Sequence, residues 1–326
     1  MVQDITLDQI ESATRIVYAE MQPTPQYCWP LLCESLGTEV WVKHENQTPI
    51  GSFKLRGGLV YFSHLAESSE KPKSVVSATK GNHGQSVGFA ARRYGIPATI
   101  VVPYGNSIEK NNAMRSLGVN LLEHGDDFQS AREYAIKMAH ENSLKMIPSF
   151  DPLLVTGVAT YSLELLKAVK DLDVVYVPIG LGSGICGMLA VRDALKLKTK
   201  VVGVVSAHAS SYAESYISRR PVESPVSTKI ADGMACRVPE QSALELFWEG
   251  VERIVLVSDD EIAEAMRILH ECTHNVCEGS GAAAYAAVMQ ESSRVKGCKV
   301  AVIASGGNID REVYAAVLNG EAFTAK

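Results

Sequence analysis

Residues 174–191 read VVYVPIGLGSGICGMLAV, eighteen positions without a charged side chain. This is the length at which a membrane-spanning helix has to be considered. The segment contains Pro178, however, and four glycines crowded into eight positions, at 180, 182, 184 and 187. Each glycine would cost a helix about 1 kcal/mol. We therefore interpret the segment as a buried strand, a glycine loop and the start of a helix, and we expect no membrane span.

On either side of this segment, apolar runs rich in Val and Ile alternate with amphipathic segments. We expect buried strands at 75–78, 99–102, 174–179, 201–205, 254–257 and 300–304. Apolar residues at three- and four-residue spacing predict helices at 85–94, 128–142, 155–169, 260–270 and 282–291. Ser258 and Glu261 have the spacing of a capping box at the start of one helix. This alternation predicts an α/β fold whose parallel sheets are covered on both faces.

Composition narrows the class of protein further. The 326 residues are 46% hydrophobic and 21% charged, which is typical of a globular chain and not of a disordered, collagen-like or coiled-coil one. The net charge is -6, and no basic block is longer than Arg219-Arg220, so we expect no nucleic-acid partner. The seven cysteines show no CxxC spacing, which favours a reducing compartment. The N-terminus is acidic and unlike a signal peptide, so we expect the cytoplasm.

No Pro- or Ser-rich linker marks a domain boundary, so the boundary has to come from topology. We expect a small domain at 73–149 and a large domain made of 1–72 and 150–326. Small ligands bind α/β proteins at the carboxyl ends of parallel strands and in clefts between domains. The loops after the strands are therefore expected to carry the chemistry.

Three such loops follow an expected strand and precede a helix, and each is rich in glycine or small polar residues. They are 77–85 (SATKGNHGQ), 180–184 (GLGSG) and 305–308 (SGGN). A glycine loop at a helix N-terminus exposes backbone N–H groups to an anion such as a phosphate. Together they suggest a phosphorylated cofactor.

Residues 182–187 also match the dinucleotide pattern G-x-G-x-x-G. That interpretation requires an acidic residue at the end of the next strand, and the strand at 201–205 is followed by Ser206. Met188 after the last glycine excludes a P-loop, and the residues around Ser183 exclude a serine-hydrolase elbow. A nicotinamide oxidoreductase stays a distant alternative.

Residues 48–58, TPIGSFKLRGG, place Lys54 near the start of an apolar helix. The positive end of a helix dipole disfavours a cation there and lowers the pKa of an amine towards its nucleophilic neutral form. From these residues alone, an ordinary exposed lysine remains open.

The motifs SFKLRGG, SATKGNHGQ, the glycine loop and SGGN, in this order over nearly the whole chain, resemble the serine/threonine dehydratase family of fold-type-II pyridoxal-phosphate enzymes. The resemblance implies a tryptophan synthase β-like fold, with two doubly wound parallel-sheet domains and the active site in the cleft between them. It also implies pyridoxal 5'-phosphate as the cofactor.

The resemblance assigns roles to individual residues. Lys54 would form the Schiff base and act as the general base, and Phe53 would pack against the pyridine ring. Asn82 would bind the phenolic oxygen. Ser305 would face the ring nitrogen, where a hydroxyl gives a weaker electron sink than a carboxylate and favours elimination over transamination. The phosphate would be held by Gly180, Leu181, Gly182, Ser183 and Gly184.

Other roles are less defined. Glu278 matches a family glutamate near the cofactor, with a simple helix-start acid as the alternative. For His83, a packed residue supporting its turn is the alternative to a catalytic one. The substrate side would include Ser77, Thr79, Lys80, Gly81, His83 and Gln85, with Gly157 and Gly233 as further candidates.

The reaction implied is β-elimination of water from L-threonine or L-serine, giving a 2-oxo acid and ammonia. The chain ends at Lys326, without the regulatory domain of biosynthetic members, so it is similar to the short catabolic type. We expect a homodimer or higher homo-oligomer. The alternatives are a serine racemase, a 3-hydroxyaspartate dehydratase-like enzyme and a non-catalytic pyridoxal-phosphate-binding protein.

Three departures from the family pattern limit the transfer. The sequence GLGSG replaces the four consecutive glycines of the family. Phosphate binding by the loop tolerates this replacement only if Leu181 and Ser183 need no positive φ. Lys80 replaces a small residue or a serine, and we hypothesise that it reaches the substrate. Ser206 and Tyr212 stand where relatives place metal-binding carboxylates, so we expect no divalent metal there.

A zinc site is a separate possibility at His270, His274 and Cys277. These residues lack a fourth zinc ligand, so we prefer to interpret them as part of a helix surface.

Overall fold

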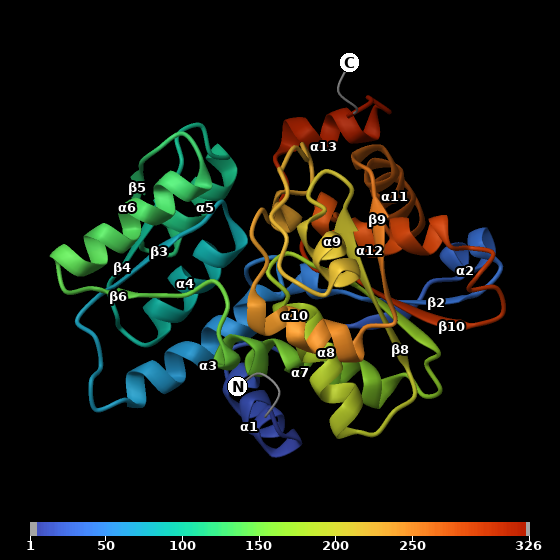
Figure 1. Cartoon of the computed structure of the whole chain (residues 1–326), viewed down its shortest axis with the longest axis horizontal. Coiled ribbons are helices and arrows are strands. Elements are labelled where there is room, and N and C mark those ends of the chain that lie inside the picture. Colours follow the sequence, from blue (N-terminus) through green and yellow to red (C-terminus); the bar gives the residue numbers. More distant parts are fainter. Residues whose placement is uncertain (1–4, 324–326) are drawn as a thin grey trace.

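Two β-sheets of different size lie beside each other in the computed structural model, which describes residues 5–323 (Figure 1). The larger sheet has the order β1-β2-β10-β7-β8-β9 and the smaller one β5-β4-β3-β6. All neighbouring strands are parallel except β1 and β2. The strands are β1 (Gln26–Cys28), β2 (Glu39–Lys43), β3 (Val75–Ala78), β4 (Ala98–Val102), β5 (Asn120–Glu123), β6 (Lys145–Met146), β7 (Val174–Pro178), β8 (Lys200–Ser206), β9 (Arg253–Val257) and β10 (Lys299–Ile303).

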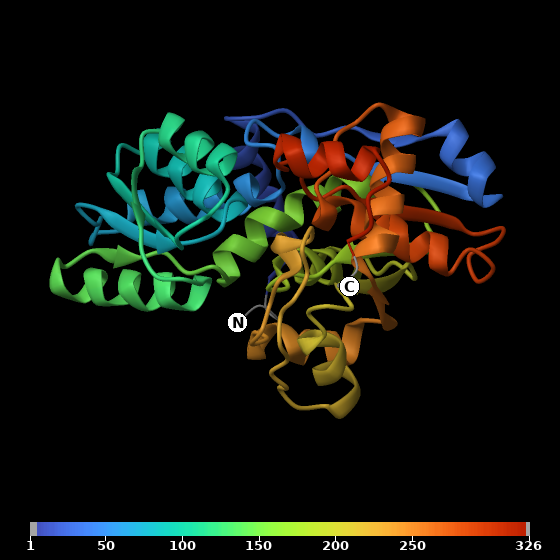
Figure 2. The ribbon, with the colours of Figure 1, turned by 90° about the horizontal axis from the view of Figure 1, so that it is seen from above.

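Helices surround both sheets, as the view from above also shows (Figure 2). They are α1 (Leu7–Tyr18), α2 (Pro30–Leu36), η2 (Glu45–Gln47), α3 (Lys54–Glu67), α4 (Asn82–Arg93), α5 (Ile108–Ser116), α6 (Phe128–Glu141), α7 (Pro152–Ala168), α8 (Ser183–Ala194), α9 (Ser211–Ser218), η3 (Asp232–Met234), α10 (Gln241–Gly250), α11 (Asp259–Thr273), α12 (Gly279–Gln290) and α13 (Arg311–Leu318). None of the helices within 5–323 is long and apolar enough to span a membrane.

The predicted strands and helices are confirmed. Each predicted strand is present with its ends within one residue, and four of the five predicted helices begin one to three residues earlier than expected. Their first turns, such as Gly279-Ser280-Gly281, lack apolar periodicity and so escaped the pattern. The capping box is formed, because Ser258 Oγ accepts from Glu261 N and Ser258 N donates to the Glu261 carboxylate.

Strand β7 shows why residues 174–191 are uncharged. Val175 and Val177 pack in a cluster with α7 and α8 on one face of the sheet. Val174 and Tyr176 pack on the other face in a cluster with α11 and α12. A strand buried on both faces reads as a continuous apolar run, and this explains the resemblance to a membrane span.

Strands β3 to β6 form the smaller sheet, and the strands before and after them in the chain form the larger one. The domain limits at 72/73 and 149/150 stay predictions.

Helices α3 and α7 approach each other through their backbones. A Cβ atom on Gly157 would lie 2.3 Å from the Arg56 carbonyl oxygen, so only glycine fits at this contact. Gly157, a candidate for the substrate side, therefore lies at a contact between helices.

A largely buried ion network stabilises the same contact. The Arg56 guanidinium donates to both oxygens of Glu45, at 2.7 and 2.9 Å, and to Glu164, at 2.6 and 3.0 Å. Lys43 pairs with the Glu164 carboxylate as well. Two cations and two carboxylates thus balance one another in a region that only the Glu164 side chain, 7% exposed, opens slightly to water, and this keeps the first turns of α3 in place.

We expect Arg56→Met to lower the free energy of unfolding by about 3–5 kcal/mol, because it leaves two buried carboxylates short of their cation. Denaturant unfolding followed by tryptophan fluorescence measures the loss. The control is Arg93→Met, which breaks the exposed pair with Glu20 and should change little. Equal losses in the two variants would contradict the stabilising role of the buried network.

Candidate active site

The segment that carries Lys54 is held against the loop that follows β10. Ser52 and Gly306 form an isolated antiparallel bridge, and Phe53 N donates to Ser305 O at 3.1 Å. Lys54 is the first residue of α3. The predicted lysine loop and the predicted SGGN loop, more than 240 residues apart in the chain, therefore meet at the carboxyl end of the larger sheet.

The Lys54 amine lies 5.2 Å from the centroid of the Phe53 ring. Burial lowers the pKa of Lys54 to about 8, and the carboxylate of Glu278 opposes this shift. The predicted lowering of the Lys54 pKa is confirmed. Its main physical cause is removal of the ammonium from water, however, and not the helix dipole on which the prediction relied.

Asn82 links the smaller sheet to two loops of the larger one. Its Nδ2 donates to Glu278 Oε1 at 2.7 Å, and its Oδ1 accepts from Asn308 Nδ2 at 2.7 Å. Glu278 directly precedes α12, but its carboxylate does not cap that helix. It binds Asn82 instead, which argues against the interpretation as a simple helix-start acid.

Glu278 is 3% exposed. Burial raises its pKa to about 7, while the nearby Lys110 ammonium opposes the shift. Near neutral pH this group can therefore both hold and release a proton. Ser305, also buried, donates from Oγ to Ser280 O at 3.2 Å.

The glycine loop enters α8 with its N-terminus free of a side-chain cap. Gly182 has a φ of +98°, in the left-handed region, whereas Leu181 and Ser183 do not have a positive φ. The condition for replacing four glycines by GLGSG is thus met. Gly180 is required for a different reason, because a Cβ atom there would lie 2.3 Å from Gly233 O.

The predicted substrate loop is held together from within. Thr79 Oγ1 accepts from the N–H groups of Gly81, at 3.0 Å, and Gly84, at 3.3 Å. Ser77 is buried in β3 and donates to the carbonyl oxygen of Ile147, directly after β6. Lys80 is exposed and has no hydrogen bond to another residue within 5–323. Ser77 and Thr79 thus support the loop, whereas Lys80 is exposed.

One residue of this region was missed by the sequence analysis. Lys110 on α5 crosses Gly81, since a Cβ atom on Gly81 would lie 2.7 Å from Lys110 Cδ. Its side chain is 10% exposed, and its ammonium binds Asp232 Oδ2 at 2.6 Å, beside Gly233. The contact joins residues 122 positions apart, so no local pattern could have indicated it.

The residues fit a pyridoxal phosphate group. Four buried polar atoms of this region have no hydrogen-bond partner within the described chain: His83 Nε2, Gln85 Nε2, Glu278 Oε2 and Ser280 Oγ. A polar ligand would satisfy such atoms. A neutralisable amine, free N–H groups at a helix start, an amide and a hydroxyl match the aldehyde, phosphate, phenol and ring nitrogen of this group.

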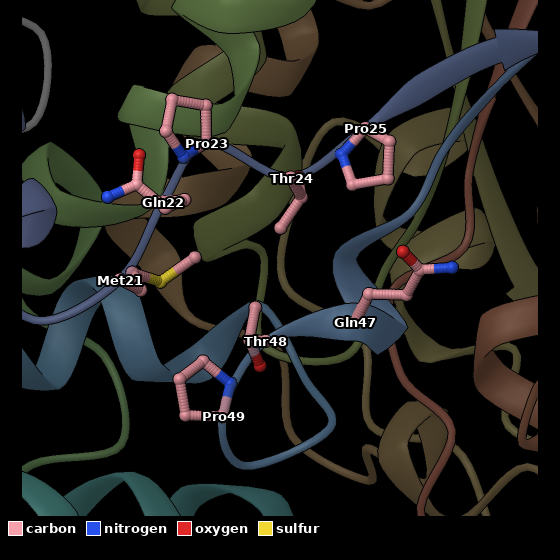
Figure 3. Close-up of a pocket in the computed structure, with 8 residues that line it drawn as sticks. All are labelled: Met21, Gln22, Pro23, Thr24, Pro25, Gln47, Thr48 and Pro49. Carbon is pink, nitrogen blue, oxygen red and sulfur yellow. The ribbon is translucent and has the colours of Figure 1, made fainter.

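A surface hollow of about 290 Å³ lies between residues 21–25 and 47–49 (Figure 3). It is lined by Met21, Gln22, Pro23, Thr24, Pro25, Gln47, Thr48 and Pro49. Thr24 accepts from Lys43 through its carbonyl and donates to Glu45 through its hydroxyl. The hollow therefore lies over the buried ion network and contains no predicted site residue.

Residues 5–323 contain no group of three or more His, Cys, Asp or Glu side chains arranged to hold a metal ion. Ser206 accepts from His208 N, and Tyr212 is buried. The absence of a divalent metal stays a prediction.

The fold and these residues define an enzyme that carries pyridoxal phosphate between two parallel-sheet units. A family model described as pyridoxal-phosphate dependent enzyme matches residues 17–306, so the chain belongs to this family. It is 35% identical to the L-threonine ammonia-lyase of Thermotoga maritima, over 97% of this chain and 78% of that one.

Solved structures of other proteins have a similar fold. The processed form of threonine deaminase isoform 2 from Solanum lycopersicum superposes with a TM-score of 0.87 at 28% identity, covering 97% of this chain and 94% of that one. Maize serine racemase superposes with a TM-score of 0.89 at 25% identity, covering 96% and 97%.

We expect Glu278→Gln to stabilise the cofactor-free protein more as the pH rises. The folded chain keeps a proton on Glu278 up to about pH 7, whereas the unfolded chain releases it near pH 4.5, so stability is lost across this window. Glutamine mimics the protonated form and keeps the acceptor for Asn82.

The expected gain approaches roughly 3 kcal/mol above pH 7 and vanishes below about pH 4.5. Denaturant unfolding of both proteins at pH 5, 6, 7 and 8 measures it. A difference that is independent of pH would contradict the raised pKa of Glu278.

Proposed function

We propose that this protein eliminates water from a hydroxy amino acid, L-threonine or L-serine, and so forms a 2-oxo acid and ammonia. The observation that carries the proposal is the buried Lys54 amine, with a pKa of about 8, beside the Asn82–Glu278 pair. The L-threonine ammonia-lyase to which the chain is 35% identical supports it.

Five features would hold the cofactor. Lys54 would bind its aldehyde carbon, the N–H groups of Gly180 to Gly184 its phosphate, and Asn82 its phenolic oxygen. Ser305 would face the ring nitrogen, and Phe53 would pack on the ring. When bound, the group draws electrons away from the α-carbon of an amino acid.

The chain's own residues would manage the protons. An amine with a pKa of about 8 is close enough to neutrality to accept the α-proton of the substrate. Glu278, with a pKa of about 7, can hold a proton next to the amide of Asn82. The Ser305 hydroxyl would leave the ring nitrogen without a formal charge partner, which favours elimination.

The substrate would lie on the loop 77–85, where Thr79, Lys80, Gly81, His83 and Gln85 would contact it and Ser77 would support the strand end. The unpartnered Nε2 atoms of His83 and Gln85 support this placement. Lys110 above Gly81 would enclose the same side.

Further parts of the proposal concern the whole protein. We propose a cytoplasmic homodimer or higher homo-oligomer, with a small domain at 73–149 and the remainder as the large domain. Size-exclusion chromatography with light scattering tests the assembly.

We expect the purified protein to show a visible absorption band of bound pyridoxal phosphate that changes on addition of L-threonine while 2-oxo acid is released. Lys54→Ala should reduce turnover by at least about a thousandfold, since it removes both the covalent anchor and the base. The matched control is Lys137→Ala, an exposed lysine of α6, which should behave as wild type.

A band without threonine turnover would direct the search to other amino acids, and inversion of serine without ammonia release would favour a racemase. Absence of a band even after addition of the cofactor would overturn the proposal.

Lys80→Ala tests the hypothesis that Lys80 binds the substrate. An exposed ammonium contributes little, so we expect a rise in KM of about two- to fivefold with kcat nearly unchanged. Steady-state kinetics with threonine, serine and 3-hydroxyaspartate measure it. Unchanged constants for all three would remove Lys80 from the site.

A further inference from the structure

Two tyrosine hydroxyls hold the carbonyl groups of the glycine loop. Tyr212 on α9 donates to Leu181 O at 2.9 Å, and Tyr161 on α7 donates to Gly184 O at 3.1 Å. Both side chains are 1% exposed. A carbonyl oxygen only accepts, so each hydroxyl proton must point at the loop.

These carbonyls set the direction of particular N–H groups. In a planar trans peptide, the C=O of one residue and the N–H of the next point in opposite directions. Tyr212 therefore fixes the N–H of Gly182, and Tyr161 fixes the N–H of Ile185. These are the first and the last of the four N–H groups that the start of α8 leaves without a helical partner.

Tyr212 also ties the loop to a third segment. Its oxygen accepts from Glu240 N at 2.9 Å, just before α10. Its ring lies 5.3 Å from that of Phe247 on the same helix. Gly182 also packs against α10, since a Cβ atom on it would lie 2.9 Å from Ala243 Cβ. One buried hydroxyl thus joins the glycine loop, α9 and the start of α10. Helix α10 contacts both α8 and α9, and the three helices are labelled near one another in Figure 1.

We propose that Tyr212 is a positioning residue for the cofactor phosphate: its hydroxyl holds the glycine loop in the orientation that presents its N–H groups to the anion. The proposal rests on the proposed function, because it takes the ligand of this loop to be the phosphate of pyridoxal phosphate. Loss of the hydroxyl frees the Leu181 carbonyl to turn, and the Gly182 N–H turns with it.

The test compares Tyr212→Phe with Tyr216→Phe. Tyr216 belongs to the same helix and donates to Val251 O at 2.9 Å, outside the glycine loop. Each protein is freed of cofactor and titrated separately with pyridoxal phosphate and with pyridoxal, which lacks the phosphate. The visible band and the quenching of tryptophan fluorescence report binding.

We expect Tyr212→Phe to raise the Kd for pyridoxal phosphate about tenfold, equivalent to about 1.4 kcal/mol, and to leave the Kd for pyridoxal unchanged. Tyr216→Phe should leave both constants as in wild type. Tyr161→Phe provides a second variant and should weaken pyridoxal phosphate binding in the same selective way.

Unchanged affinity for pyridoxal phosphate in Tyr212→Phe would overturn the proposal, as would an equal loss for both ligands, which would indicate general destabilisation. Failure of the wild-type protein to bind pyridoxal phosphate would overturn the proposed function itself, and is thus distinguishable from failure of the role of Tyr212.

Discussion

The site depends on main-chain pairing between the segment before α3 and the loop after β10. The bridge between Ser52 and Gly306 and the bond from Phe53 N to Ser305 O place Lys54 at the carboxyl end of the larger sheet. A lysine at a helix start would otherwise extend into water. Here the pairing keeps its amine buried, and burial is what lowers its pKa. The ion pairs of Arg56 with Glu45 and Glu164 stabilise the position of the same helix.

A second constraint is the chain of hydrogen bonds through Asn82. It joins the smaller sheet to Glu278 and Asn308 of the larger one, so the two sheet units share one polar centre. Each charged group in this centre influences the others. Lys54 and Lys110 oppose the rise in the pKa of Glu278, and Glu278 opposes the fall in that of Lys54. The protonation of the site is therefore a property of the group and not of any single side chain.

Pattern analysis worked for elements that are buried on both faces. Strands such as β7 and β10 are continuous apolar runs, and the loops after them contain the motifs that led to the cofactor. It missed β5, which is partly exposed, and β6, which has two residues. It also missed β1, which has three residues, and β2, where exposed Glu39 and half-buried Trp41 interrupt the apolar run. Helices such as α12 begin in glycine-rich turns without apolar periodicity, so their predicted starts came late.

The amino-acid sequence by itself determined the α/β class, the three loops at the strand ends and the candidate residues Lys54, Asn82 and Ser305. The class and the loops follow from local composition and spacing, whereas Lys54, Asn82 and Ser305 follow from the resemblance of their motifs to the serine/threonine dehydratase family. Only the tertiary structure decided that Glu278 binds Asn82, that Lys110 rather than Lys80 lies over Gly81, and that Tyr212 holds the glycine loop. Such contacts join segments far apart in the chain, and their partners are selected by packing, which leaves no periodic signal in the sequence.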